Sequence, residues 1–262
     1  MKESSYFQIK EFQEEKDMFY LLLLISHSDE KLIFSDKKNY IIARSSPGLP
    51  VLIWSKDNLS QELIMEIEKI IKEHYLHDEI TPFTCKKELY EALEKDFECS
   101  DYFEMGFLSC LKVKNIKKID GFLDHPNYGD KTTLAKYWQN NEKELQSRQD
   151  ITFENALEEV EDWLENDNFY VWRNQNGKIV SMASFGIKEN FAKITHVYTP
   201  KEERCKGYCT NLIHSLTINL LQEGLHPILY TDYHYLASNH TYQKVGFQDQ
   251  GFLINFKIKR GG

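Results

Sequence analysis

The stretch that decides the fold reads Val-Tyr-Thr-Pro-Lys-Glu-Glu-Arg-Cys-Lys-Gly-Tyr-Cys, residues 197–209. An alternating run of apolar and polar residues at 191–198 leads into it and predicts a β-strand. Beyond it, apolar residues recur at helical spacing and predict an amphipathic helix; they are Cys209, Leu212, Ile213, Leu216 and Leu220. We therefore expect this stretch to join a strand to the N-terminus of a helix.

A helix N-terminus that follows a short loop is suited to bind an anion. Its first backbone N–H groups have no acceptor within the helix, and the helix dipole favours negative charge there. Gly207 lets the backbone approach an anion closely because it has no Cβ, and Arg204 and Lys206 add positive charge. These features predict a phosphate site, although a single glycine in such a loop is a common feature.

The residue order of this loop resembles the acyl-CoA pyrophosphate loop of the GNAT acetyltransferase superfamily. It looks closest to the branch whose loop reads roughly Val-Tyr-Thr-Pro-Pro-x-x-Arg-x-x-Gly-Tyr-Ala. The matching positions are Val197, Tyr198, Thr199, Pro200, Arg204, Gly207 and Tyr208. Two positions depart from this pattern: Lys201 stands where a second proline is frequent, and Cys209 where Gly or Ala is usual.

A second segment, residues 229–247, is similar to the other cofactor segment of the same family. Leu-Tyr-Thr-Asp at 229–232 is followed by Ser238, Asn239 and Tyr242, and then by Lys-Val-Gly-Phe at 244–247. Two matching segments at the expected separation are more specific than either one alone. On the acceptor side the sequence departs from the family, because Tyr-His-Tyr-Leu-Ala at 233–237 replaces its usual small residues.

The resemblance implies an α/β (α+β) fold with a mixed, mostly antiparallel central sheet flanked by helices. We expect two domains, 1–125 and 126–262, of which the second is a catalytic acetyltransferase domain that binds acetyl-CoA. The first has the order β-β-α-β-α-β and no counterpart of the loop at 204–207. Arg-Ser-Ser-Pro at 44–47 and the strand after it resemble a degenerate GNAT-like N-terminal domain, so a structural or substrate-shaping role is expected.

Periodicity and turn residues predict the elements of both halves. In the first half we expect helices at 9–26, 59–75 and 87–97 and strands at 40–44, 51–54, 83–85 and 103–113. Residues 121–130 are rich in glycine, proline and asparagine and are expected to form a linker or loop. In the second half we expect a helix at 131–148, another starting at Thr152, and a short one capped by Ser238 or Asn239.

The resemblance also assigns the residues that bind the cofactor. They are Val197, Tyr198, Thr199, Arg204, Cys205, Lys206, Gly207, Tyr208, Cys209 and Asn239. The loop amides from 205 to 209 would hold the pyrophosphate, and the strand edge at 197–199 would pair with the pantetheine amides like an added strand. Asn239 would contact the pantetheine arm. The thiol of Cys209, at a helix N-terminus, is expected to have a lowered pKa.

Acetyl transfer from a thioester to an amine needs a group that stabilises the departing sulfur. A thiol has a pKa near 8.5 and a tyrosine hydroxyl one near 10, so full proton transfer from tyrosine would be uphill by roughly 2 kcal/mol. We therefore expect a strong hydrogen bond from tyrosine to sulfur, with protonation completed as the amine loses its proton. By resemblance the catalytic tyrosine is Tyr242.

The attacking amine must also be neutral. An amine with a pKa near 10.4 is neutral about once in two thousand molecules at pH 7, so a general base or a water chain is needed. His196 has a suitable ordinary pKa, although strand alternation could point it away from the cleft. Glu189, Asp232 and the acidic face of the helix after Thr152 are the other candidates, and such a face is most often simply solvated.

Composition restricts the class of partner. The formal charge of −9 and pI near 5.5 argue against nonspecific nucleic-acid binding, which requires a basic face. The longest apolar run, 18–25, is too short to span a bilayer, and the polar N-terminus has no signal-peptide pattern. Five cysteines without framework spacing fit a reducing cytoplasm, and no metal site is expected.

Two functional hypotheses follow. The first is an acetyl-CoA-dependent N-acetyltransferase, monomeric or homodimeric, that acts on a primary amine of a small molecule or peptide by direct attack in a ternary complex. The alternative is a non-catalytic acyl-CoA-binding or regulatory module with the same fold. A general nucleotide phosphate site is a weak third hypothesis, because the sequence has no Gly-x-x-x-x-Gly-Lys-Ser/Thr loop.

Overall fold

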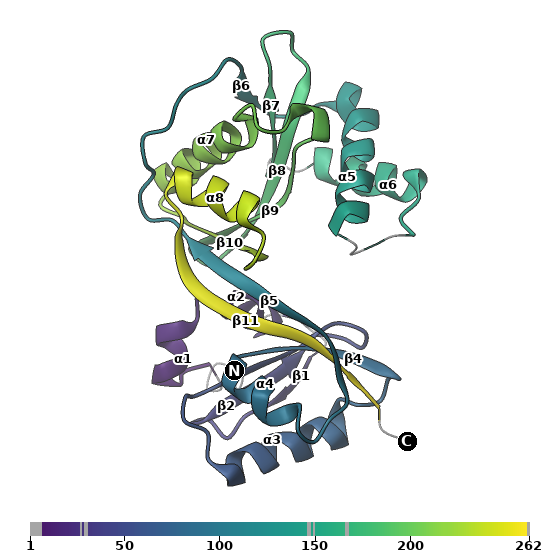
Figure 1. The fold of residues 1–262 in the computed structure, drawn as a ribbon, viewed down its shortest axis with the longest axis vertical. Coiled ribbons are helices and arrows are strands. Elements are labelled where there is room, and N and C mark those ends of the chain that lie inside the picture. Colours follow the sequence, from purple (N-terminus) through teal and green to yellow (C-terminus); the bar gives the residue numbers. More distant parts are fainter. Residues whose placement is uncertain are drawn as a thin grey trace. The chain divides into compact units, whose positions relative to one another are not determined.

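The computed structural model describes residues 7–26, 28, 31–145, 148, 150–165 and 168–260 (Figure 1). Its strands belong to a mixed, mostly antiparallel sheet in the order β1-β2-β3-β4-β11-β5-β10-β9-β8-β7-β6. The chain divides into two compact units. The N-terminal unit comprises Met1–Phe107, Thr231–His234 and Gln250–Gly262, and the C-terminal unit comprises Leu108–Tyr230 and Tyr235–Asp249. The expected fold class is confirmed.

The N-terminal unit packs its helices against its strands around an apolar core. Its elements are α1 (Lys10–Glu15), α2 (Tyr20–Ser26), β1 (Leu32–Phe34), β2 (Tyr40–Arg44), β3 (Val51–Ser55), α3 (Gln61–His74), β4 (Ile80–Cys85), α4 (Lys87–Leu93), most of β5 (Cys99–Ser109) and most of β11 (Gln248–Lys259). Strands β2 and β3 are buried at every position, and Ile67 and Ile71 of α3 lie in the same core. The sequences of these strands are therefore mostly apolar and do not alternate between apolar and polar residues.

The single helix expected at 9–26 is wrong, because the structure has two short helices there. The Trp54 indole Nε1 donates to the Glu15 carboxylate at 2.7 Å, and Lys86 Nζ lies 2.6 Å from the same carboxylate. Phe12 packs edge-on against Trp54, with ring centroids 5.6 Å apart. These tertiary contacts hold the end of α1 against β3, so the chain turns at 16–19 and helix propensity is overridden.

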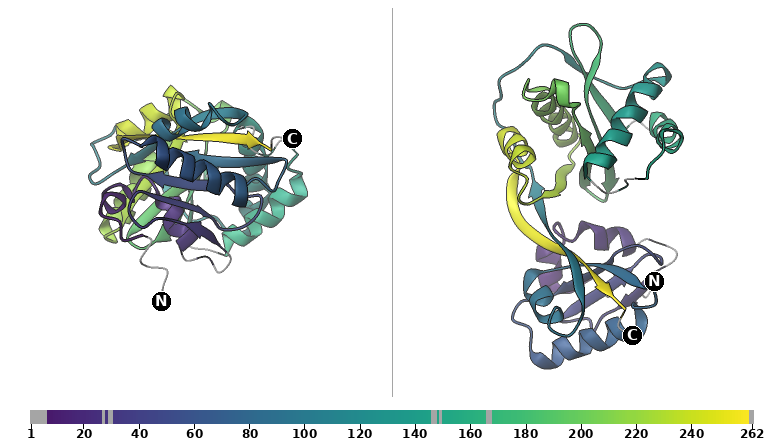
Figure 2. Two further views of the ribbon diagram at one scale, coloured as in Figure 1. Left: turned by 90° about the horizontal axis from the view of Figure 1, so that it is seen from below. Right: turned by 45° about the vertical axis from the view of Figure 1, so that its right-hand side comes forward.

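The C-terminal unit has two apolar cores on the two faces of its strands. Its elements are β6 (Phe122–Asp124), the 3-10 helix η2 (Tyr128–Asp130), α5 (Lys131–Leu145), α6 (Phe153–Leu164), β7 (Phe169–Arg173), β8 (Ile179–Lys188), β9 (Phe191–Tyr198), the 3-10 helix η3 (Lys201–Glu203), α7 (Tyr208–Gln222), most of β10 (His226–Asp232) and α8 (Leu236–Val245). Helices α7 and α8 cover one face, and α5 and α6 cover the other (Figures 1 and 2).

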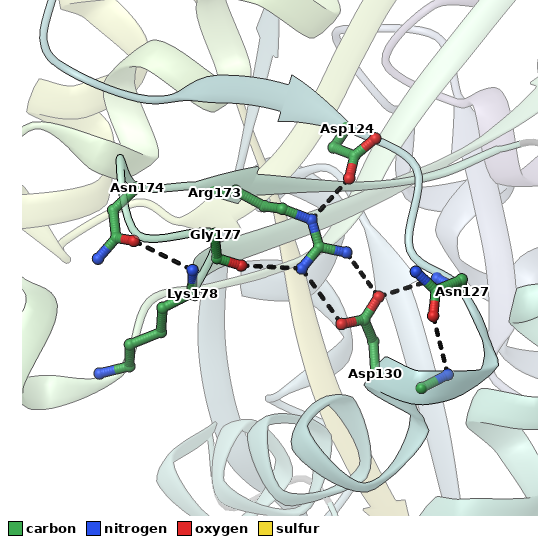
Figure 3. A network of polar contacts seen from close by, with 8 residues as sticks. Asp124, Asn127, Asp130, Arg173, Asn174, Gly177 and Lys178 are labelled. Atoms are coloured by element: carbon green, nitrogen blue, oxygen red, sulfur yellow. Dashed lines mark hydrogen bonds and ion pairs between the residues drawn. The ribbon is translucent and has the colours of Figure 1, made fainter.

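The start of the C-terminal unit is more ordered than a linker. Residues 122–124 form β6, which pairs antiparallel with β7, so the expected linker or loop at 121–130 is wrong for that part. Arg173 explains the order (Figure 3): its Nε donates to Asp124 and its Nη2 to Asp130, both at 2.6 Å. Asp130 also accepts the Asn127 N–H at 2.9 Å. Hydrogen bonds therefore order a segment whose glycine, proline and asparagine residues predicted a loop.

The two units differ in extent from the domains expected at 1–125 and 126–262. Residues 108–125 lie in the C-terminal unit, and residues 250–262 return to the N-terminal unit. The Cys110 N–H donates to the Pro227 carbonyl at 3.0 Å, so the chain is already part of the C-terminal unit at that point. Strands that contribute residues to both units are difficult to recognise from sequence, because nothing in their pattern marks the crossing.

The short helix before the last strand begins earlier than expected. Helix α8 starts at Leu236, and its N-cap is Tyr235, which makes no side-chain capping hydrogen bond. Ser238 and Asn239 lie inside the helix, so the expectation that one of them caps it is wrong. By contrast, the helix start expected at Thr152 is confirmed: Thr152 is the N-cap of α6, and its hydroxyl accepts the Asn155 N–H at 3.1 Å. Within the described residues no helix is long and apolar enough to cross a membrane.

Replacing Arg173 by alanine should destabilise the protein by about 2–3 kcal/mol. The side chain is 12% exposed and holds two carboxylates, so its loss leaves Asp124 and the largely buried Asp130 without their cation. The matched control is Arg148→Ala, which removes an exposed pair with Glu159 and should cost under about 1 kcal/mol. Urea unfolding measures both, and equal losses would contradict the role of Arg173.

Candidate active site

A bulge in β9 determines which side chains reach each face of the sheet. Ser184 of β8 pairs with Thr195, but Met182 pairs with Tyr198, so β9 has one extra residue in this interval. His196 has a φ of 51°, the left-handed conformation that such an extra residue often adopts. Beyond the bulge, side chains of β9 therefore lie on the face opposite to the one that strict alternation would give. Ile194 lies in the α7–α8 core, whereas Tyr198, four residues later, lies in the α5–α6 core.

Strand β9 pairs with β10 over only part of its length. The parallel pairing joins Phe191–Lys193 to His226–Ile228, three residue pairs, yet β9 continues to Tyr198 and β10 to Asp232. Among the described residues, no pairing between these two strands is recorded beyond Lys193. The backbone of 194–198 thus keeps an edge toward β10 that is free to accept an extended partner.

The loop after β9 ends at a helix N-terminus that no side chain caps. Gly207 is the N-cap of α7 and has a φ of 88°, a left-handed conformation that glycine adopts without a steric penalty. The N–H groups of Tyr208, Cys209 and Thr210 therefore have no acceptor within α7, whose first bond runs from Asn211 N to Gly207 O at 3.0 Å. Three adjacent donors at the positive end of a helix form an anion site.

The cations of this loop are already paired with carboxylates. Arg204 Nη2 lies 2.6 Å from Glu144 of α5, and its Nε donates to the Thr199 carbonyl at 2.9 Å. Lys206 Nζ lies 2.8 Å from Glu203, which also binds Lys178 at 2.7 Å. Arg204 therefore fastens the loop to the end of β9, and the attraction for an anion comes mainly from the backbone donors.

Cys209 faces the hydroxyls of Ser181 and Thr199, whose oxygens lie 2.8 Å apart. Burial raises the pKa of the Cys209 thiol to about 11, although hydrogen bonds from Thr199 and Ser181 act in the opposite direction. The lowered pKa expected from the helix N-terminus is therefore wrong. Desolvation of the half-buried thiol outweighs the dipole, so Cys209 is a small neutral group at pH 7.

Tyr242 lies on the same face of the sheet as Cys209. It is 8% exposed and belongs to the core beneath α7 and α8, where its ring meets Phe247 edge-on with centroids 6.0 Å apart. Burial, with a smaller contribution from Cys209, raises the pKa of the Tyr242 hydroxyl. The hydroxyl is therefore fully protonated at neutral pH and is a hydrogen-bond donor. Asn239 precedes Tyr242 by three residues in α8, so the two share a helix face.

His196 lies on the opposite face, against α5 and α6. Its ring stacks on Trp163 with centroids 4.7 Å apart and meets Trp138 edge-on at 4.7 Å, and its Nδ1 is 2.8 Å from Ser184 Oγ. Burial first, and then Lys193, lower the pKa of His196 to about 4. The imidazole is thus neutral at pH 7 and a weak base. Its role as the general base stays a prediction.

Glu189 and the acidic residues of α6 are two of the other base candidates. Glu189 lies in the turn between β8 and β9, seven residues before His196, which is about 20 Å along an extended chain. On α6, Glu159 binds Arg148 and accepts the Trp138 indole N–H, and Glu161 binds Lys131. The remaining acidic residues of α6 are exposed; they are Glu154, Glu158 and Asp162. This face is therefore mostly solvated or paired.

Three residues that shape the site were not predicted from the sequence. Glu144 holds Arg204, and Ser181 Oγ donates to the Tyr198 carbonyl at 3.2 Å. Asn211 is 5% exposed and donates to both the Gly207 carbonyl at 3.1 Å and the Lys117 carbonyl at 3.3 Å. Only Asn211 could have been suspected, since it is a polar residue on the buried face of α7 one turn after Gly207. In the described part of the chain, no His, Cys, Asp and Glu side chains gather into a metal-binding group.

Comparison with known proteins agrees with this geometry. Residues 134–247 match the model of the acetyltransferase (GNAT) family. No curated protein matches the sequence. Among solved structures, a GNAT-family acetyltransferase from Colwellia psychrerythraea superposes with a TM-score of 0.62 at 14% identity, over 93% of this chain and 97% of that one.

Two further structures have the same fold. A GCN5-related N-acetyltransferase from Kribbella flavida gives a TM-score of 0.61 at 10% identity, over 94% of this chain and 95% of that one. Another from Sphaerobacter thermophilus gives 0.56 at 11% identity, over 86% of this chain and 82% of that one. The family match covers residues 134–247, and the superpositions show that the chain has the fold of GNAT proteins over most of its length.

Thiol alkylation should modify Cys205 well before Cys209. Cys205 is exposed, whereas the thiolate form of Cys209 is well under about 0.1% at pH 7.5 because its pKa is about 11. Peptide mapping by mass spectrometry after timed iodoacetamide treatment measures both rates, and Cys85, fully buried, is the internal unreactive reference. Modification of Cys209 as fast as Cys205 would contradict the raised pKa.

Proposed function

We propose that this chain is an acetyl-CoA-dependent N-acetyltransferase that acts on a primary amine of a small molecule or peptide. The single observation that carries the proposal is the early end of the β9–β10 pairing beside the uncapped N-terminus of α7. The first feature offers a strand edge and the second an anion site. Pantetheine carries amides and the adjoining pyrophosphate is anionic, so the two features match the two chemically distinct parts of one ligand.

The residues present fit that ligand. The amides of 205–209 would bind the pyrophosphate, with Cys205 and Gly207 both in the left-handed conformation that turns successive N–H groups toward one point. The edge at Val197–Thr199 would pair with the pantetheine amides. Arg204 would position the loop through Thr199 rather than neutralise the phosphates, because its charge is matched by Glu144. Asn239 would contact the pantetheine arm.

When bound, acetyl-CoA supplies a thioester. The amine would attack the acetyl carbon of this thioester directly in a ternary complex. The net change joins the amine nitrogen to the acetyl carbon and breaks the carbon–sulfur bond, and the proton lost by nitrogen balances the one gained by sulfur. Tyr242 would donate a hydrogen bond to the sulfur, for which its raised pKa keeps it protonated. Cys209 beside it would stay neutral, which avoids a negative charge where the sulfur becomes negative.

The proposed general base is His196. His196 would accept a proton only weakly at a pKa of about 4, so we propose that it acts through water, with Ser184 orienting the ring. The tautomer of His196 decides whether Nδ1 donates to Ser184 Oγ or accepts from it. Holding both substrates together would supply much of the remaining rate enhancement.

We also infer that the N-terminal unit binds no acyl-CoA and has a structural or substrate-shaping role. Its helix α3 is capped by Ser60, whose hydroxyl accepts the Leu63 N–H at 3.3 Å. In the loop before it, the Glu88 carboxylate accepts the N–H groups of Asn58 at 3.2 Å and Leu59 at 3.3 Å. The chain's own oxygens thus occupy the donors that α7 leaves free.

The direct test combines equilibrium binding of acetyl-CoA with release of free thiol over a panel of amines and basic peptides. We expect binding, and thiol release that depends on one class of amine and yields the N-acetyl product by mass spectrometry. Tight binding with no turnover on any amine would favour the alternative, a non-catalytic acyl-CoA-binding module. Absence of binding would overturn both.

Gly207→Glu should reduce acetyl-CoA affinity by about 100-fold or more, because the carboxylate enters the anion site and repels the pyrophosphate. The matched control is Gly224→Glu at the other end of α7, where φ is 76° and an added Cβ meets nothing within 4 Å. Both variants place a side chain on a left-handed backbone, so we expect their thermal stabilities to be comparable. Loss of acetyl-CoA binding in Gly207→Glu but not in Gly224→Glu would support the site. Retained affinity in Gly207→Glu would place the pyrophosphate elsewhere.

Tyr242→Phe should lower kcat by about 100-fold and leave the Kd for acetyl-CoA within about twofold. The substitution removes the hydroxyl and leaves the ring that packs on Phe247. Tyr128→Phe is the control, because it removes an exposed hydroxyl 3.4 Å from Glu165 and should change neither constant. Steady-state kinetics with calorimetric Kd values measure the effect, and an unchanged kcat in Tyr242→Phe would exclude the tyrosine from the reaction.

A further inference from the structure

The connection from β5 to β6 is basic in an acidic protein. Residues 111–119 read Leu-Lys-Val-Lys-Asn-Ile-Lys-Lys-Ile, with four lysines and no carboxylate, whereas the whole chain has a formal charge of −9. This segment precedes residues 134–247 and so lies outside the part that matches the acetyltransferase family. Its charge is therefore a property of this chain that the family assignment does not explain.

The segment is held along α7 and α8 by backbone contacts. The Lys114 N–H donates to the Val245 carbonyl at 2.7 Å, and the Lys114 carbonyl is 3.1 Å from His214 Nε2 of α7. An added Cβ on Gly246 would lie 2.6 Å from the Lys112 carbonyl, so glycine is required for this close approach. Figure 1 shows the segment passing α8 and then α7 on its way to β6. Its lysines are thus presented from an ordered backbone.

Two adjoining cavities lie between this segment and α8. The first, about 370 Å³, is lined by Lys114, Asn115, His240, Gln243 and Lys244. The second, about 470 Å³, shares Lys114 and Asn115 with it and is lined further by Lys112, Val113, Gly246 and Gln248. We call these two together the lysine groove. Its polar lining consists of lysine, amide and imidazole groups, and no carboxylate lines it.

The lysines of the groove differ from those near the loop at 199–207, because among the described residues they have no acidic partner. Lys178 and Lys206 are held by Glu203, but in the part of the chain that the structure describes, Lys112, Lys114 and Lys244 are in no ion pair. Lys114 Nζ donates to the Gln243 carbonyl at 3.0 Å. The lysines of the groove therefore lack the carboxylate contacts that Lys178, Arg204 and Lys206 make near the loop.

The groove is close enough to the loop for one ligand to reach both. His214, which contacts Lys114, follows Gly207 by seven residues, or about 10 Å along α7. Asn211 lies between them and joins the Lys117 carbonyl to the Gly207 carbonyl. A phosphorylated ribose and a purine ring attached to a pyrophosphate at Gly207 extend over a distance of this order.

We propose that the lysine groove binds the phosphate monoester on the nucleotide end of the acyl-CoA, its 3′-phosphate. The inference rests on the proposed function, since it assumes that the pyrophosphate lies at the N-terminus of α7. A phosphate monoester carries nearly two negative charges at pH 7, and charge-assisted hydrogen bonds from ammonium groups are among the strongest in proteins. The groove then supplies the positive charge that Glu144 and Glu203 remove from the loop.

The test compares CoA with 3′-dephospho-CoA by isothermal titration calorimetry. The wild-type protein should bind CoA about tenfold or more tightly than dephospho-CoA. The variant Lys112→Ala/Lys114→Ala and the variant Lys244→Ala should lose most of this preference while keeping their dephospho-CoA affinity within about twofold. Preference should also fall as salt rises, because exposed lysines are screened.

The control variant is Lys136→Ala/Lys143→Ala, which removes two exposed lysines of α5 and should keep the full preference. An equal loss in this control would show that overall charge, not the groove, causes the preference and would overturn the inference. Equal affinity of the wild type for CoA and dephospho-CoA would overturn the proposal that the groove binds the 3′-phosphate, but not the proposed function. Failure to bind either compound would overturn the proposed function as well, so the two failures are distinguishable. Circular dichroism and Tm confirm that each variant is folded.

Discussion

The structure of the C-terminal unit depends on the point at which β9 leaves β10. Three residue pairs join the two strands, and the next residues of β9 contain a bulge at His196 that turns the remaining backbone away from ideal pairing. Without that separation, residues 194–198 would be an ordinary interior strand with both edges satisfied. With it, a strand edge and the free amides of α7 lie within one loop of each other, and Tyr242 is on the same face as that loop.

Electrostatics divide the site into parts with different tasks. Cys209 and Tyr242 are neutral at pH 7, since burial raises the pKa values of both side chains. In the loop, Arg204 and Lys206 each contact a carboxylate, so they stabilise its shape. We propose that net positive charge is concentrated farther out, on the lysines of 112–118. An anionic ligand would then be attracted at one end and held in a neutral environment at the other.

The sequence predicted the helices and strands that local residue patterns determine. The alternation at 191–198, the helix after Gly207 and the apolar strands β2 and β3 all follow from periodicity, and the structure confirms them. It did not predict what distant residues impose: the break at 16–19 depends on Trp54 and Lys86, and β6 depends on Arg173. The pKa of Cys209 was predicted in the wrong direction because the helix dipole can be read from sequence but burial cannot. The face occupied by His196 depends on a one-residue bulge, which strand periodicity does not reveal.

Hydrogen–deuterium exchange with and without saturating acetyl-CoA tests the central claim most directly, because it reports on backbone amides and requires no knowledge of the acceptor. The account predicts that two separate segments gain protection together: the strand edge at 194–199 and the loop and helix start at 205–210. Protection in both segments would agree with one ligand that pairs with the strand and places its pyrophosphate on α7. Saturated binding that leaves the exchange of both segments unchanged would contradict the account.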